Sequence, residues 1–245
     1  MLNQPERHNA ISRSMWARLT ELFQQLDTDE SVRAVILRGA GRQAFSSGAD
    51  ISEFAEERST PEQASRYNAL VGQAMETAAT LSKPLVALIH GYCVGGGCEL
   101  ATCCDLRYCN QQAQFGIPMV KLGISMGFEE IQRLAQLVGP ASANEILMLG
   151  RRVNAQRALE MGLVNAVINA DDLDNHVAGV ARELAENAPL SVQFAKRAIK
   201  LLMGHLDRDQ IPDRDAMVNG LFQTEDCREG VRAFLEKRRP RFIGR

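Results

Sequence analysis

The sequence predicts an α/β fold built around a parallel sheet. Short, continuous apolar runs at 34–37 and 85–89 are typical of buried strands, and segments with helical periodicity alternate with them. From about residue 190 the chain is strand-poor and reads as helices alone. We therefore expect an α/β core over residues 1–189 and a C-terminal helical oligomerisation region over residues 190–245.

The individual elements follow from periodicity and from local stop signals. Apolar residues recur at helical spacing over 11–26, which predicts an amphipathic helix. Thr60, Pro61 and Gln63 predict the start of the next helix, because threonine caps, proline suits the first turn and glutamine completes a capping box. That helix is expected to end near 83, and others to occupy 98–102, 128–137, 140–149, 154–161, 171–187, 190–203 and 224–238; further strands are expected at 106–109, around 115 and at 163–168.

Composition excludes several classes of protein. The net charge is −2, from 28 basic and 30 acidic residues, so no overall attraction to nucleic acid exists. No apolar run approaches the ~20 residues of a membrane span, and the first residues lack the layout of a signal peptide, so a cytoplasmic protein is expected. The six cysteines contain no C-x-x-C pair, which favours buried reduced thiols over a metal site.

Two glycine-marked loops, at 45–50 and 91–97, each follow a predicted strand. In a parallel sheet both emerge at the carboxyl edge, where α/β folds bind ligands. A phosphate loop is disfavoured, because Gly97 and Cys98 stand where Lys and Ser or Thr are required. The backbone N–H groups of Ala49 and Gly96 are candidates to hold an oxyanion instead, and the alternative is that the glycines serve only tight turns.

Glu99 is the candidate proton carrier. It lies in an otherwise uncharged stretch between Cys98 and Asp105. A carboxylate in an apolar helix is expected to have a raised pKa, which suits proton transfer near neutral pH. The alternative is a glutamate on a solvated helix edge.

Seven stretches together resemble the enoyl-CoA hydratase/isomerase (crotonase) family over essentially the whole chain; they are 2–10, 45–51, 91–100, 104–106, 113–116, 158–164 and 229–238. The resemblance implies a superhelix of ββα units with a C-terminal helical trimerisation region, assembled as a homotrimer or a dimer of trimers. It implies an acyl-CoA substrate, with no cofactor beyond the coenzyme A that the thioester carries.

Site residues are implied by matched position. Ala49 and Gly96 fall on the two oxyanion-hole donors of the family, and Glu99 falls on one of its two catalytic carboxylates. The positions implied to contact coenzyme A are Arg7, His8, Ala10, Ser47, Asp50, Ile51, Phe234 and Lys237, the last two reaching the coenzyme A of a neighbouring subunit.

The chain departs from the family pattern where the hydratases carry their second carboxylate, because Met119 stands there. Methionine neither activates water nor moves a proton. Glu129 and Glu130 are possible substitutes, although acids in the first turn of a helix ordinarily serve to stabilise the helix dipole. Family members also commonly carry a strand and hairpin before the first motif, whereas this sequence starts at that motif.

Two hypotheses remain open from the sequence. The first is an enoyl-CoA hydratase/isomerase-type enzyme of fatty acid metabolism, in which Glu99 supports hydration or a double-bond shift; the shift needs only one base. The second is a specialised acyl-CoA hydrolase or decarboxylase, or a non-catalytic acyl-CoA binder that lost activity with the carboxylate at Met119.

Overall fold

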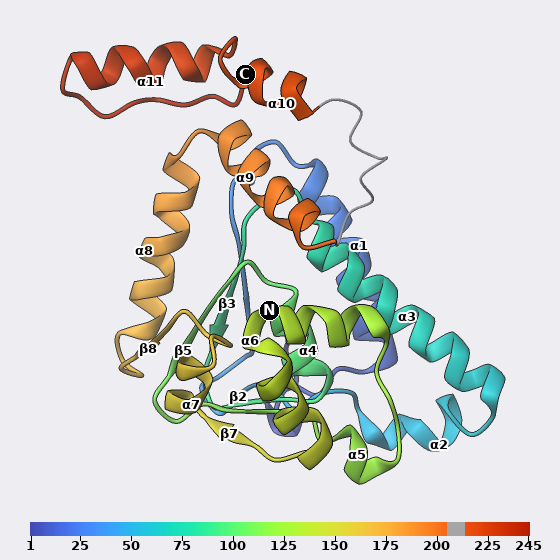
Figure 1. Ribbon diagram of the computed structural model, residues 1–245. Coiled ribbons are helices and arrows are strands. Elements are labelled where there is room, and N and C mark those ends of the chain that lie inside the picture. Colours follow the sequence, from blue (N-terminus) through green and yellow to red (C-terminus); the bar gives the residue numbers. More distant parts are fainter. Residues whose placement is uncertain (205–213) are drawn as a thin grey trace.

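A computed structural model describes residues 1–204 and 214–245. Within them lie two four-stranded sheets (Figure 1). The first is wholly parallel and has the order β1 (Val35–Arg38), β3 (Leu85–Ile89), β5 (Leu106–Asn110), β8 (Ala166–Ile168). The second has the order β2 (Ala44–Ser46), β4 (Tyr92–Val94), β6 (Gln114–Gly116), β7 (Val153–Asn154), with only β7 antiparallel.

Successive units of the chain add one strand to each sheet and then a helix. β1 and β2 precede α3 (Pro61–Thr80), β3 and β4 precede α4 (Gly96–Thr102), and β5 and β6 precede α6 (Phe128–Leu149). The repetition winds the chain into a spiral and confirms the predicted α/β fold class. β3 is buried along its whole length, as expected of a central parallel strand.

The two predicted loops are partly wrong, because each contains a strand of the second sheet. β2 occupies the start of the stretch expected to be a loop at 45–50, and β4 occupies the middle of 91–97. Both strands are three residues long. That length is too short for an alternating pattern to emerge against neighbouring glycines and serines.

The helices mostly begin and end within a few residues of the predicted limits. Thr60 forms the predicted capping box with Gln63 at the start of α3. α6 is broken at Gly139, whose φ of 75° and ψ of 158° are non-helical, as Gly139 and Pro140 predict. The remaining helices are α1 (Arg13–Thr28), α2 (Phe54–Glu57), α5 (Met119–Leu122), α7 (Ala155–Glu160), α8 (Leu173–Glu186), α9 (Pro189–Leu202), α10 (Arg214–Leu221) and α11 (Glu225–Leu235), with short 3₁₀ turns at Pro5–Arg7 and Ile51–Glu53.

One buried core joins the two sheets to the helices around them. Phe45 of β2 and Phe115 of β6 are buried in it, together with Trp16 and Tyr67 from α1 and α3. Five of the cysteines are buried and all six are free thiols, which confirms the expectation for these residues apart from the half-buried Cys227.

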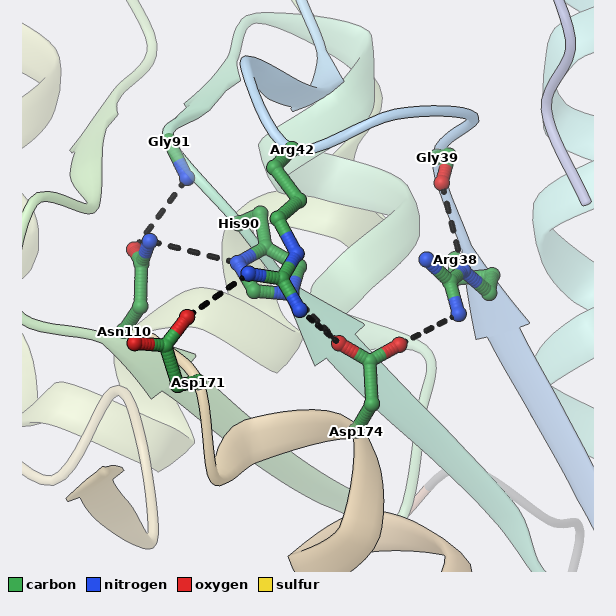
Figure 2. A network of polar contacts seen from close by, with 8 residues as sticks. All are labelled: Arg38, Gly39, Arg42, His90, Gly91, Asn110, Asp171 and Asp174. Carbon is green, nitrogen blue, oxygen red and sulfur yellow. Dashed lines mark hydrogen bonds and ion pairs between the residues drawn. The ribbon is translucent and has the colours of Figure 1, made fainter. Parts of the chain in front are cut away.

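A polar network ties α8 to the carboxyl ends of the first sheet (Figure 2). His90, directly after β3, lies between Asn110 and Asp174, with ring nitrogens 3.2 and 3.0 Å from them. The side-chain amide oxygen of Asn110 accepts from the N–H of Gly91, so the amide NH₂ group of Asn110 donates to Nδ1 of His90. Nε2 of His90 therefore carries the ring proton and donates to Asp174. Asp174 also accepts from Arg38 at 2.5 Å. The network fixes the start of the loop that leads to β4 and α4.

The C-terminal helices α10 and α11 lie at one end of the molecule (Figure 1), where α10 contacts α9. α11 carries a buried Ala233, but Phe222, Phe234 and Leu235 of this segment are exposed. In the described residues, no helix combines the length and the apolar character that crossing a membrane requires.

Candidate active site

The backbone nitrogens of Ala49 and Gly96 lie close to each other where the glycine-marked segments meet. Gly48 has a φ of +100°, and a Cβ on it would lie 3.2 Å from the nitrogen of Gly96. A Cβ on Gly96 would in turn lie 3.6 Å from the nitrogen of Ala49. Within the described residues neither the Ala49 nor the Gly96 N–H donates a hydrogen bond to the chain. Two neighbouring free donors are a suitable site for an oxygen that gains negative charge.

The N-terminal segment holds this arrangement in place. Ile11 pairs with the segment around Ala49, because its N–H donates to the Gly48 carbonyl at 2.7 Å and its carbonyl accepts from Asp50 at 3.0 Å. The hydroxyl of Ser46 donates to the Asn9 carbonyl at 2.8 Å and accepts from the Gly48 N–H at 3.1 Å. The donor of Ala49 is therefore fixed before any ligand arrives.

Glu99 lies on the first turn of α4, three residues after Gly96. Burial raises the pKa of its carboxyl group from 4.5 to about 7. The value of about 7 already includes a smaller rise from the negative charge of Glu130 and an opposing effect of the positive charge of Arg58. A carboxyl group with a pKa near 7 both holds and releases a proton at neutral pH, as the sequence led us to expect.

Glu130 and Glu129 differ sharply in their surroundings. Glu129 is exposed, as an ordinary acid of the first turn of α6 would be. Glu130 is only 7% exposed, with its carboxylate over the backbone of Gly127 and 3.7 Å from the guanidinium of Arg133. Met119 is partly buried at the start of α5. α6 thus carries a buried carboxylate whose charge reaches Glu99, whereas position 119 carries none.

Three further residues at the site escaped the sequence analysis. The guanidinium of Arg58 lies 4.3 Å from the ring centre of Tyr67 and 4.4 Å from that of Phe54. Trp16 packs against Gly96, since a Cβ there would meet its ring at 3.2 Å. Nothing in the sequence marks Arg58, Tyr67 or Trp16 as site residues. Arg58 ends a charged stretch that resembles a solvated surface, and Tyr67 and Trp16 fit ordinary helical core positions.

Six of the residues matched to coenzyme A contacts lie in or beside the segment around Ala49. Arg7 forms an ion pair with Asp50 at 2.6 Å, and the Ser47 hydroxyl donates to the Arg7 carbonyl at 3.1 Å. The Ser47 N–H donates to the His8 carbonyl at 2.9 Å. Ala10 and Ile51 adjoin the same segments, Ala10 buried and Ile51 exposed.

Phe234 and Lys237 do not join this group. Phe234 lies near the end of α11, where it is 82% exposed, and Lys237 lies two residues beyond the helix. Their expected contact with a neighbouring subunit stays a prediction. In the part of the chain that the structure describes, no group of three or more His, Cys, Asp or Glu side chains is arranged to hold a metal ion.

Comparison with known proteins gives one consistent family. The family model described as enoyl-CoA hydratase/isomerase matches residues 1–245. A crotonyl-CoA hydratase from Syntrophomonas wolfei is 36% identical, with 100% of this chain and 93% of the relative covered. A mitochondrial Delta(3,5)-Delta(2,4)-dienoyl-CoA isomerase from Mus musculus is 34% identical, with 97% and 76% covered. The crystal structure of an enoyl-CoA hydratase/carnithine racemase from Magnetospirillum magneticum superposes with a TM-score of 0.92 at 39% identity, with 100% and 91% covered.

Proposed function

Because this chain belongs to the enoyl-CoA hydratase/isomerase family, we propose that it adds water to the double bond of a 2-enoyl-CoA thioester. The proposal rests on one observation, the Glu99–Glu130 carboxyl pair beside the converging N–H groups of Ala49 and Gly96. Hydration needs one group that activates water and another that protonates carbon, and a pair supplies both.

The N–H groups of Ala49 and Gly96 bind the thioester oxygen in this mechanism. When water attacks C3, the electrons of the double bond move through C2 onto that oxygen, and an enolate forms. The two donors stabilise the new negative charge, and each such donor is worth ~2.7–4 kcal/mol in the activation free energy. Their fixed position means that no reorganisation is needed as the charge develops.

The two carboxyl groups divide the proton transfers. Glu130, held by the positive charge of Arg133 at 3.7 Å, accepts the proton that the attacking water releases. Glu99, whose pKa of about 7 keeps it protonated below neutral pH, donates its proton to C2 and collapses the enolate. The sum is H and OH added across C2 and C3, after which Glu130 returns a proton to Glu99.

A double-bond shift is the second candidate, and the methionine at position 119 favours it. A single base removes a proton at one carbon and returns it at another, so Glu99 alone suffices. The similarity to the mouse dienoyl-CoA isomerase is in keeping with this chemistry. In that case Glu130 acts only by raising the pKa of Glu99.

The ultraviolet absorbance of the conjugated enoyl thioester separates these reactions. Purified protein is given crotonyl-CoA and, separately, a 3-enoyl-CoA. We expect loss of conjugation from crotonyl-CoA, and a loss of rate of about 10²–10⁴-fold in both Glu99→Gln and Glu130→Gln. Glu129→Gln is the matched control and is expected to keep full activity. Gain of conjugation from the 3-enoyl substrate, with Glu130→Gln still active, would identify the isomerase instead.

The coenzyme A group is proposed to lie along Arg7, His8, Ala10, Ser47, Asp50 and Ile51. Arg7 keeps more than half of its side-chain surface accessible despite its ion pair, so its charge is available to a phosphate. Phe234 and Lys237 are proposed to complete this site in a neighbouring copy. The exposed apolar residues of α10 and α11, at one end of the molecule, support a homotrimer or a dimer of trimers. Light scattering tests the assembly, and a monomeric mass at micromolar concentration would rule it out.

A further inference from the structure

Three neighbouring buried polar atoms at the site, in addition to Nε of Arg133, have no hydrogen-bond partner in the part of the chain described. They are Nε1 of Trp16, the hydroxyl of Tyr67 and Nε of Arg58. Trp16 and Tyr67 are 0% and 1% exposed, so bulk solvent does not take the place of a partner. Folded proteins pair nearly all of their buried polar groups. Unpaired ones gathered at a site therefore point to a ligand.

These atoms border the reacting part of the site. The Trp16 ring packs on Gly96, whose N–H is one of the two proposed oxyanion donors. Arg58 is close enough to Glu99 for its positive charge to lower the pKa of that carboxyl group. Tyr67 lies between the two, in ring contact with Arg58 and with its hydroxyl towards Trp16. An acyl chain held by its thioester at Gly96 would therefore begin beside the Trp16 ring.

The three donors lie next to one another, with Tyr67 between Trp16 and Arg58. An indole N–H only donates, and that of Trp16 approaches the Tyr67 hydroxyl closely enough to oppose the rise that burial causes in the tyrosine pKa, although without forming a well-aligned bond. The hydroxyl proton of Tyr67 is consequently left for another acceptor. The guanidinium carbon of Arg58 lies over the rings of Phe54 and Tyr67, and these contacts leave its N–H groups to bind an anion.

Arg58 also lacks a negative partner. In the described residues no carboxylate lies within ion-pair distance of it, whereas the buried Arg133 is 3.3 Å from Glu76 and 3.7 Å from Glu130. The carboxyl group that its charge reaches is Glu99, which the proposed hydration requires in its protonated form. A half-buried guanidinium without a dedicated anion is costly unless the substrate brings one.

We propose that Arg58 and the Tyr67 hydroxyl bind a carboxylate on the acyl chain, with Trp16 orienting Tyr67, so that the substrates are coenzyme A thioesters of dicarboxylic acids. This proposal deepens the proposed function and rests on it. The substrate carboxylate would form a planar, two-point ion pair with Arg58 and accept a hydrogen bond from Tyr67. A plain alkyl chain would leave Arg58 and the Tyr67 hydroxyl unpaired.

The test compares binding of saturated thioesters, so that catalysis is not required. Succinyl-, glutaryl- and adipyl-CoA are titrated calorimetrically against butyryl-, pentanoyl- and hexanoyl-CoA at pH 7.5. We expect the dicarboxylic member of at least one pair to bind roughly tenfold more tightly, a difference of about 1.4 kcal/mol. Arg58→Met and Tyr67→Phe should abolish that preference while alkyl-CoA binding stays within about twofold. Arg58→Lys should retain part of it, because the charge remains without the planar fork.

Exposed Arg66, on α3 beside Tyr67, gives the matched control for the loss of one arginine. Arg66→Met should preserve the preference. Tight binding of both series without any preference would overturn the substrate class and leave the proposed function standing. An equal loss for both series in Arg58→Met and Arg58→Lys would show that Arg58 only supports the fold, and would also overturn it. Failure to bind either series would refute the proposed function itself.

Discussion

Replacing Glu99 by glutamine tests the ionisation on which the proposed chemistry depends. The carboxyl pKa is raised from 4.5 to about 7, first by burial and second by the charge of Glu130. The folded chain therefore holds this proton more tightly than the unfolded chain does. The resulting stabilisation is complete below pH 4.5 and is lost as the pH rises through about 7.

The size of the effect follows from the same two values. One pKa unit corresponds to about 1.4 kcal/mol, so the gap between 4.5 and about 7 amounts to about 3 kcal/mol. Glu99→Gln has no proton to lose. Between pH 4.5 and 8 the free energy of unfolding of the wild type should thus fall by about 3 kcal/mol relative to that of the variant. Other titrating groups are common to both proteins and cancel in the difference.

Urea unfolding at fixed protein concentration across this pH range measures the difference directly. Glu129→Gln should follow the wild type, because the side chain of Glu129 is exposed and its charge is not among the causes of the raised pKa of Glu99. Glu130→Gln should show a smaller fall, because the second cause of the raised pKa is absent. Wild-type and Glu99→Gln curves that stay parallel would refute the raised pKa, and with it the assignment of Glu99 as the acid.

The rate of hydration is expected to fall over the same pH range in which the stabilisation is lost. If Glu99 donates the proton to C2, kcat/KM for hydration falls as the pH rises through about 7. A rise over the same range would show instead that ionised Glu99 is the reacting form and would transfer the role of acid to Glu130.

Three other substitutions probe the remaining parts of the site. Gly127→Ala places a Cβ against the carboxylate of Glu130, so we expect kcat to drop at least tenfold with stability little changed; an unchanged kcat would argue against Glu130. Arg7→Ala should raise KM for acyl-CoA several-fold and leave kcat unaltered, as steady-state kinetics would show. Gly97→Ala forces a methyl group to within 2.5 Å of the Ser46 Cβ, and should lower the free energy of unfolding by about 1–3 kcal/mol in urea titrations.

Sequence patterns predicted the helices and strands that are determined by interactions between residues close together in the chain. The apolar run of β3 and the capping box at Thr60 carry their signal within a few residues, and the structure has both as expected. β2 and β4 were missed because a three-residue strand gains its stability from pairing with distant strands. The raised pKa of Glu99 was predictable from its apolar neighbours in the chain. The part played by Glu130 was not, since it depends on where the first turn of α6 lands.

The role proposed for Glu130 means that a matched motif alone is an incomplete guide to activity. What the reaction requires is a second acid near Glu99, whichever element carries it. Met119 removes that acid from the start of α5, and Glu130 restores a negative charge that reaches Glu99 from α6. An exposed substitute would be screened by water and would scarcely shift the pKa of Glu99. Glu130 shifts the pKa of Glu99 because it is buried. Without Arg133 beside it, the free energy needed to bury its charge would be too high. The Glu130–Arg133 ion pair on α6 is therefore what the proposed reaction needs in place of a carboxylate at position 119.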